Sequence, residues 1–104
     1  MMGGENMPEE ALRELKTKVF QYKSTVAEME KTENALIRYQ QDKEQAVSEA
    51  DEAVLKGDLD AFVCVRERMS IIDMLISMAE SSFGLFRTVA AKQILEIIES
   101  IDQI

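Results

Sequence analysis

A chain of 104 residues, 46% hydrophobic and 31% charged, suits one folded domain and is too apolar for an intrinsically disordered protein. Its formal net charge of −8 repels the phosphates of nucleic acids and anionic lipids, so we expect neither nucleic acid nor membrane as a partner. Histidine, the commonest general base and metal ligand, is absent, and the low content of proline and glycine favours an all-α fold.

The N-terminal residues 1–7 show no hydrophobic periodicity and contain two glycines, so we expect them to form a flexible tail. Pro8 is expected in the first turn of a helix, where the missing N–H of proline costs nothing. Glu9 and Glu10 follow it and suit the positive end of the helix dipole. Residues 8–104 are expected to form a single helical-hairpin domain.

The first helix is expected over about residues 8–56, with apolar side chains in a heptad repeat. This spacing is typical of the narrow seam of a coiled coil. The seam residues are Leu12, Leu15, Val19, Tyr22, Val26, Met29, Leu36, Val47, Ala50 and Val54. Glu33, Gln40 and Lys43 also fall at seam positions, and they indicate either a register shift or a means of setting pairing specificity.

A turn is predicted at residues 56–58, where the sequence reads Lys-Gly-Asp. Gly57 suits the left-handed conformation that ends many helices, and Asp58 suits the N-cap of the next helix. We therefore expect an antiparallel hairpin of two long, coiled-coil-like helices. Folding at Gly57 places Ala50 opposite Val65.

The second helix, expected over about residues 59–103, carries a wider apolar surface than the first. Its a and d positions hold Phe62, Val65, Met69, Ile72, Ile76, Ala79, Phe83, Phe86 and Ala90. The flanking c and g positions are also apolar and hold Cys64, Ile71, Leu75, Met78, Leu85 and Val89. Together these positions cover an arc of about 160°, which a partner with one narrow seam cannot cover.

The uncovered part of the second helix is the predicted interface with another molecule. Its residues are expected to be Ile71, Met74, Leu75, Met78 and Leu85. A second copy of the chain would cover them, giving a homodimer or higher oligomer, and the dimer would be a four-helix bundle. An amphipathic helix of another protein would fit the same methionine-rich surface. Polar Gln40 falls opposite Ile76 in the hairpin, so the stretch 69–86 is expected to be covered least by the first helix.

Small residues recur every seven positions on the other side of the second helix, as Ser70, Ser77, Gly84 and Ala91. Such a line permits close approach of another helix, which gives Gly84 a role in packing. The alternative is a break at Ser81–Gly84 that would divide the chain into three helices.

No motif of a known catalytic or cofactor site occurs in the sequence, so we expect no catalytic residue, no cofactor and no metal. Cys64 lies in an apolar run and is expected to be a small buried side chain. As the only cysteine it fits a reducing compartment, and no secretion signal is evident. After residue 60 no charge-free run is longer than Met74–Ala79, which is too short to span a bilayer. A cytoplasmic location is therefore expected.

These features predict a non-catalytic structural or interaction protein. The oligomeric hairpin would act as a scaffold, an adaptor or a secretion-chaperone-like binder of a helical partner. In size, acidity and hairpin character the chain is similar to small helical export chaperones, a likeness of class that no motif carries. Two alternatives remain from other classes: an acidic regulator that mimics nucleic acid, and an enzyme with a carboxylate-based site.

Overall fold

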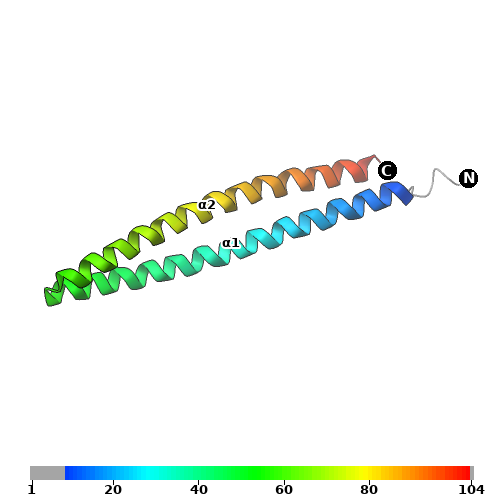
Figure 1. Ribbon diagram of the computed structural model, residues 1–104. Coiled ribbons are helices and arrows are strands. Elements are labelled where there is room, and N and C mark those ends of the chain that lie inside the picture. The colour runs from blue at the N-terminus through cyan, green and yellow to red at the C-terminus, as the bar shows by residue number, and fades with distance from the viewer. Residues whose placement is uncertain (1–8, 104) are drawn as a thin grey trace, which may run out of the picture. The chain divides into compact units, whose positions relative to one another are not determined.

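The computed structural model describes residues 9–103, which form two helices joined by a tight turn (Figure 1). Helix α1 spans Glu9–Lys56 and helix α2 spans Leu59–Asp102. The predicted all-α hairpin of two long helices is thereby confirmed. The flexible tail predicted for residues 1–7 and the predicted place of Pro8 lie outside the described residues.

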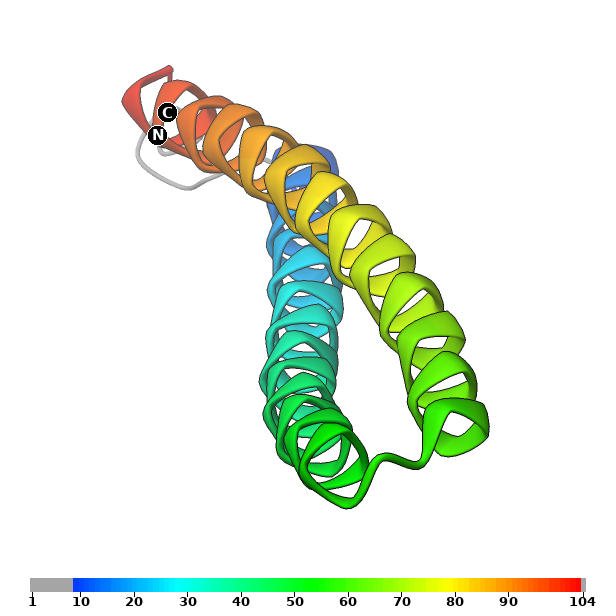
Figure 2. The same cartoon turned by 90° about the vertical axis from the view of Figure 1, so that its left-hand side faces the viewer.

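The turn between the helices is a Schellman motif followed by an N-cap (Figure 2). Gly57 has a φ of 71°, the one positive φ among residues 9–103, and its N–H donates to the carbonyl of Val54 at 3.0 Å. The N–H of Asp58 donates to the carbonyl of Ala53 at 2.9 Å. A carboxylate oxygen of Asp58 then accepts from the N–H of Ala61 at 3.1 Å. Gly57 and Asp58 thus end α1 and begin α2 as the sequence predicts.

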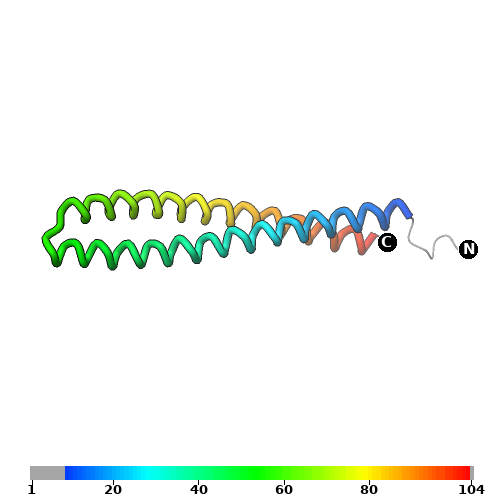
Figure 3. Tube along the Cα trace, turned by 60° about the horizontal axis from the view of Figure 1, so that its bottom comes forward, coloured from blue at the N-terminus to red at the C-terminus, as the bar shows by residue number. Residues whose placement is uncertain are grey.

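The chain divides into two compact units, each containing one segment of each helix. The turn unit is Lys31–Phe83, in which the two helical segments run antiparallel away from the turn (Figure 3). The terminal unit takes the described residues through Glu30 and those from Gly84 onward. That residues 8–104 form a single domain stays a prediction.

The core of the turn unit is a small apolar cluster between the helices. Ala46 of α1 is fully buried, and it packs with the buried side chains of Val65 and Ile72 on α2. Partly buried apolar side chains pack around this cluster, from Tyr39, Ala50, Met69 and Ile76. Bulky residues of α2 therefore meet a small residue of α1 at the centre of the unit.

The α1 seam in the turn unit differs from the predicted one. At each predicted a position, the side chain in the seam is that of the preceding residue. The side chains at the interface are those of Thr32, Tyr39, Ala46 and Ala53. The predicted seam residues Val47 and Val54 are instead 48% and 56% exposed. The physical reason is volume: Val65 and Ile72 fill the space between the helices, so alanine fits where the backbones are closest.

Two of the three predicted polar seam residues do not lie in the seam. Glu33 and Gln40 are exposed, and the half-buried ring of Tyr39 takes the place predicted for Gln40. The predicted mismatch of Gln40 with Ile76 is therefore wrong. Lys43 does lie in the seam, and its Nζ is 2.7 Å from Oδ1 of Asp73 on α2.

Ion pairs on the rim of the seam fix the register of the two helices. Besides Lys43 with Asp73, Arg68 of α2 pairs with Glu49 of α1. All four side chains are about half exposed, so each pair contributes at most about 1 kcal/mol to stability. Both pairs lie within two residues of the register that folding at Gly57 predicts.

Helix α2 is continuous, so the predicted alternative of a break at Ser81–Gly84 is wrong. Its predicted seam is confirmed, because every a and d residue from Phe62 to Ala90 is buried or half-buried. A Cβ built on Gly84 would meet no atom within 4 Å. The small residues of this side of α2 therefore do not pack against another described helix.

In the terminal unit, Ala90 and Ile97 of α2 are buried. Lys18 of α1 donates a hydrogen bond from its Nζ to Oγ of Ser100 at 2.7 Å, which ties the two helices together near the chain ends. The side-chain oxygen of Gln93 is buried there without a hydrogen-bond partner. The seam of this unit thus combines apolar and polar layers.

Candidate interaction surface

The predicted interface residues all lie on α2, but they differ in exposure. Ile71, Met74 and Met78 in the turn unit are 54%, 55% and 60% exposed. Leu85 in the terminal unit is 64% exposed. Leu75 is instead half-buried, because its g position brings it close to α1. Four of the five side chains are thus available to another molecule along most of their surface, and their role in binding stays a prediction.

We define the α2 patch as Ile71, Met74 and Met78 of the turn unit. Spacings of three and four residues place these side chains on one side of α2 over two helical turns. Methionine has an unbranched, flexible side chain that adapts to irregular surfaces. The patch therefore has the chemistry of a surface that packs against another apolar helix.

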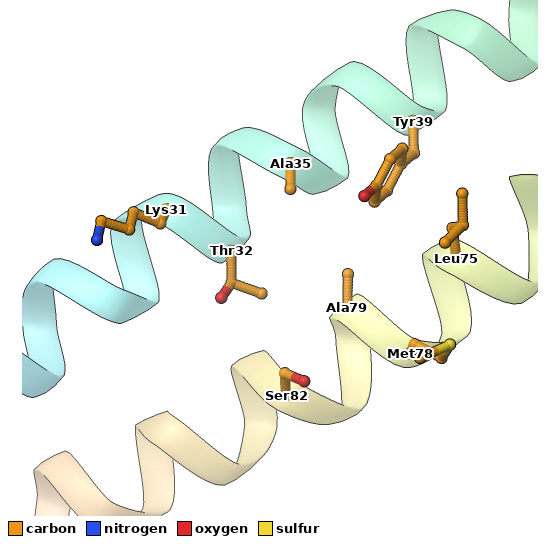
Figure 4. Close-up of a pocket in the computed structure, with 8 residues that line it drawn as sticks. All are labelled: Lys31, Thr32, Ala35, Tyr39, Leu75, Met78, Ala79 and Ser82. Atoms are coloured by element: carbon orange, nitrogen blue, oxygen red, sulfur yellow. The ribbon is translucent and has the colours of Figure 1, made fainter.

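A groove of about 280 Å³ lies between α1 and α2 beside the patch (Figure 4). Its lining residues are Lys31, Thr32, Ala35 and Tyr39 of α1 and Leu75, Met78, Ala79 and Ser82 of α2. Ala35 and Ala79 point toward one another across it, and Lys31 and Tyr39 lie at opposite ends. The groove exists because small side chains face each other where larger ones would fill the space. Met78 belongs both to the groove and to the patch.

The other hollows along the turn unit have a different character. One of about 410 Å³ is lined by Gln40, Lys43, Glu44 and Val47, three of which are polar. Another lies at Asp42, Gln45, Arg68 and Ile72, again with mostly polar walls. The groove beside the α2 patch differs from these two because one of its lining residues, Met78, also belongs to the patch.

A second set of exposed apolar side chains, which the sequence analysis missed, flanks the turn. Leu55 is 79% exposed and Leu59 is 72% exposed, and Val54 and Val63 are more than half exposed. Leu55, Leu59 and Val63 lie outside the predicted a and d positions, which was the available signal, whereas Val54 was predicted in the seam. Asp58 and Asp60 lie next to Leu59 in the sequence.

Cys64 is exposed, so the prediction of a buried cysteine is wrong. The reason is its heptad position: the neighbouring Val65 points into the seam, whereas Cys64 lies one residue away from it. Cys64, Ile71 and Met78 are spaced by seven residues and hence share one column along α2.

Lys56 and Glu52 form an ion pair near the C-terminal end of α1. The Nζ of Lys56 donates a hydrogen bond to Oε1 of Glu52 at 2.7 Å. This hydrogen bond, aided by the attraction of opposite charges, lowers the pKa of Glu52 and raises the pKa of Lys56. Both groups are fully exposed on α1, where such an i,i+4 pair supports the helix. In the described part of the chain, no three Asp, Glu or Cys side chains gather as a metal site would require.

By length and composition, α2 is the one described helix that meets the criteria for crossing a membrane. Its most apolar stretch of 18 residues has a mean hydropathy of 1.3, and 6% of that stretch is buried within the protein. The exposed carboxylates of Asp73 and Glu80 lie close to the α2 patch in sequence. Moving one such charge to the centre of a bilayer costs about 2.5–3.5 kcal/mol on insertion scales.

Comparison with known proteins finds no match to this chain among protein families, curated proteins or solved structures. The function is accordingly argued from the α2 patch and the groove beside it.

Proposed function

We propose that the protein is a non-catalytic interaction protein, an oligomeric helical hairpin that acts as a scaffold or adaptor. It associates with a second copy of itself through the α2 patch. The observation that carries this proposal is the exposure of Ile71, Met74 and Met78, each more than half exposed, on one side of a helix beside a groove. A contiguous apolar surface rimmed by polar residues marks an interaction site in soluble proteins.

The expected strength of association follows from the area that the patch offers. Full burial of an isoleucine or methionine side chain contributes about 1.5–3 kcal/mol. Because each patch side chain is a little over half exposed, its burial in a partner contributes about 1 kcal/mol, or about 6 kcal/mol for the six side chains of a symmetric dimer. Association costs at least about 4 kcal/mol in lost freedom of motion. These two contributions leave about 2 kcal/mol, so the micromolar association that the proposal requires depends on about 6 kcal/mol more from burial of Leu75, of the groove walls and of the side chains around the patch.

The same surface supports a role as an adaptor or as a secretion-chaperone-like binder. An amphipathic helix of another protein presents apolar side chains at i, i+3, i+4 and i+7, which is the spacing that the α2 patch shows together with Leu75. Flexible methionine side chains at Met74 and Met78 adapt to different partners. In this role the partner helix competes with the second copy for the patch.

The proposal is tested by sedimentation equilibrium of the full chain over the micromolar concentration range. The test variant is Ile71→Glu with Met78→Glu, which places four carboxylates in a symmetric interface. The matched control is Leu59→Glu with Val63→Glu, because these two side chains are comparably exposed on α2 outside the patch. Circular dichroism confirms that each variant keeps its helices.

We expect the wild type and the control to dimerise and the test variant to remain monomeric. A wild-type chain that is monomeric and soluble throughout the range would contradict the proposal. Dimerisation of the test variant with wild-type affinity would show that another surface carries the contact.

A further inference from the structure

We infer that the second copy binds in one orientation: α2 of one copy runs antiparallel to α2 of the other, and Ile71 of each copy enters the groove of its partner. This inference rests on the proposed self-association through the α2 patch. The observation that supports it is that the exposed side chain of Ile71 and the groove beside Met78 lie on the same side of α2.

Ile71 is the protruding element, with 54% of its surface exposed. The groove that would receive it begins one turn further along α2, where Leu75, Met78, Ala79 and Ser82 form one wall. Ile71 and Met78 are seven residues apart, which is about 10 Å along a helix. The groove volume of about 280 Å³ is large enough for a branched aliphatic side chain together with part of a neighbouring one.

The spacing of Ile71 and the groove, together with two-fold symmetry, determines the orientation of the two α2 helices. In a two-fold dimer the contact of Ile71 with the partner's groove occurs twice, because identical patches face each other. A two-fold axis perpendicular to α2 and close to Leu75 lies midway between Ile71 and the centre of the groove. Rotation about that axis places each Ile71 over the other copy's groove and makes the two α2 helices antiparallel. An axis parallel to α2 would instead set Ile71 against Ile71 and leave both grooves empty, which close packing disfavours.

Charges at the rim of the patch favour the same orientation. Glu67 is exposed one turn before Ile71 on α2, and Lys31 lies at the far end of the groove (Figure 4). In the antiparallel arrangement, Glu67 of one copy lies at the same level along the helix axis as Lys31 of the other, so opposite charges share that level. In the parallel arrangement, Glu67 would face Glu67 and Arg68 would face Arg68. Rim charges of this kind select the orientation more than they add affinity.

Cysteine cross-linking distinguishes the two orientations, and the protein supplies one probe itself. Cys64 is free, exposed and on the same column of α2 as Ile71. In the antiparallel dimer the two Cys64 residues are separated by about 33 Å along the helix axis, whereas in a parallel dimer they lie at the same level. The second probe is Leu75→Cys in a Cys64→Ala background, because Leu75 lies at the inferred axis. Glu80→Cys in the same background is the control, since Glu80 is exposed and lies on the side of α2 away from Ile71, Met74 and Met78.

Under mild oxidation we expect rapid disulfide formation for Leu75→Cys, and for the native Cys64 none above the level seen with Glu80→Cys. Cross-linking of both Leu75→Cys and native Cys64 would overturn the antiparallel arrangement while leaving self-association through α2 intact. Cross-linking of neither, with a monomer in sedimentation, would overturn the proposed function as well. Circular dichroism of Leu75→Cys shows whether this variant remains folded, and Met78→Cys with a short bifunctional maleimide is the second probe if it does not.

Discussion

We expect opposite effects of the substitution Gly→Ala at Gly57, in the turn, and at Gly84, within α2. Neither site has an atom within 4 Å of a built Cβ, so packing contributes little at either and only the backbone conformation differs. Gly57 has a φ of 71°, a conformation that costs an L-residue about 1–2 kcal/mol. Gly84 lies within α2, where alanine is more favourable than glycine by about 0.5–1 kcal/mol. Gly57→Ala should therefore destabilise the protein by about 1 kcal/mol, and Gly84→Ala should stabilise it by a little less.

The free energies of unfolding are measured by urea denaturation followed by circular dichroism, at one protein concentration because dimerisation contributes to apparent stability. The difference between the two variants should be about 1.5–2 kcal/mol, which for a domain of this size corresponds to a separation of roughly 6–16 °C in Tm. Gly57→Val should cost more than Gly57→Ala, since a β-branched side chain tolerates positive φ least. A neutral or stabilising Gly57→Ala would refute the assignment of the turn to Gly57.

Three further predictions concern the seam, the charge and the pH dependence. Ala46→Leu should destabilise by about 1–3 kcal/mol because it overfills the cluster with Val65, whereas Val47→Leu should change stability by less than about 0.5 kcal/mol; equal effects in urea denaturation would contradict the observed seam. Raising the salt concentration should tighten self-association, because it screens the repulsion between two chains of net charge −8, and weaker dimers in sedimentation would contradict an apolar interface. Lys56→Gln should raise the pKa of Glu52 toward its usual value in a carbonyl-detected NMR titration. Since the pKa of Glu52 is lowered in the folded protein, its contribution to stability is present above the pKa of the unfolded state and is lost as the pH falls. A pKa of Glu52 that stays unchanged in Lys56→Gln would show that Lys56 is not its partner.

The hairpin, its turn and the α2 seam could be predicted from the sequence because local signals specify them. Gly57 and Asp58 have backbone preferences that act within a few residues, and the α2 seam holds large apolar side chains at nearly every heptad position. In α1 the apolar residues are sparse, and the larger Val47 is a more obvious seam residue than Ala46. Whether Ala46 or Val47 is buried depends on how much space Val65 and Ile72 of α2 occupy between the helices. The sequence of α1 alone does not contain this information.

The candidate surface could be predicted only in part, because some of its features depend on one helix and others on the pairing of two. The exposure of Ile71 and Met78 follows from the width of the apolar arc on α2, which is a property of one helix. The groove depends on Ala35 and Ala79 facing each other across two helices, which requires the register of the hairpin as well. Cys64 was mispredicted because an apolar run suggests burial, although its position beside Val65 places it outside the seam.

Isotope-filtered NMR can detect directly whether the α2 patch of one copy packs against the groove of another. A mixture of copies labelled at isoleucine and methionine methyl groups with unlabelled copies reports only contacts between molecules. The account predicts intermolecular cross-peaks from the methyl groups of Ile71 and Met74 to the side chains of Tyr39 and Ala79 on the other copy. A dimer that shows no such cross-peaks, or shows them from side chains outside the patch, would contradict it.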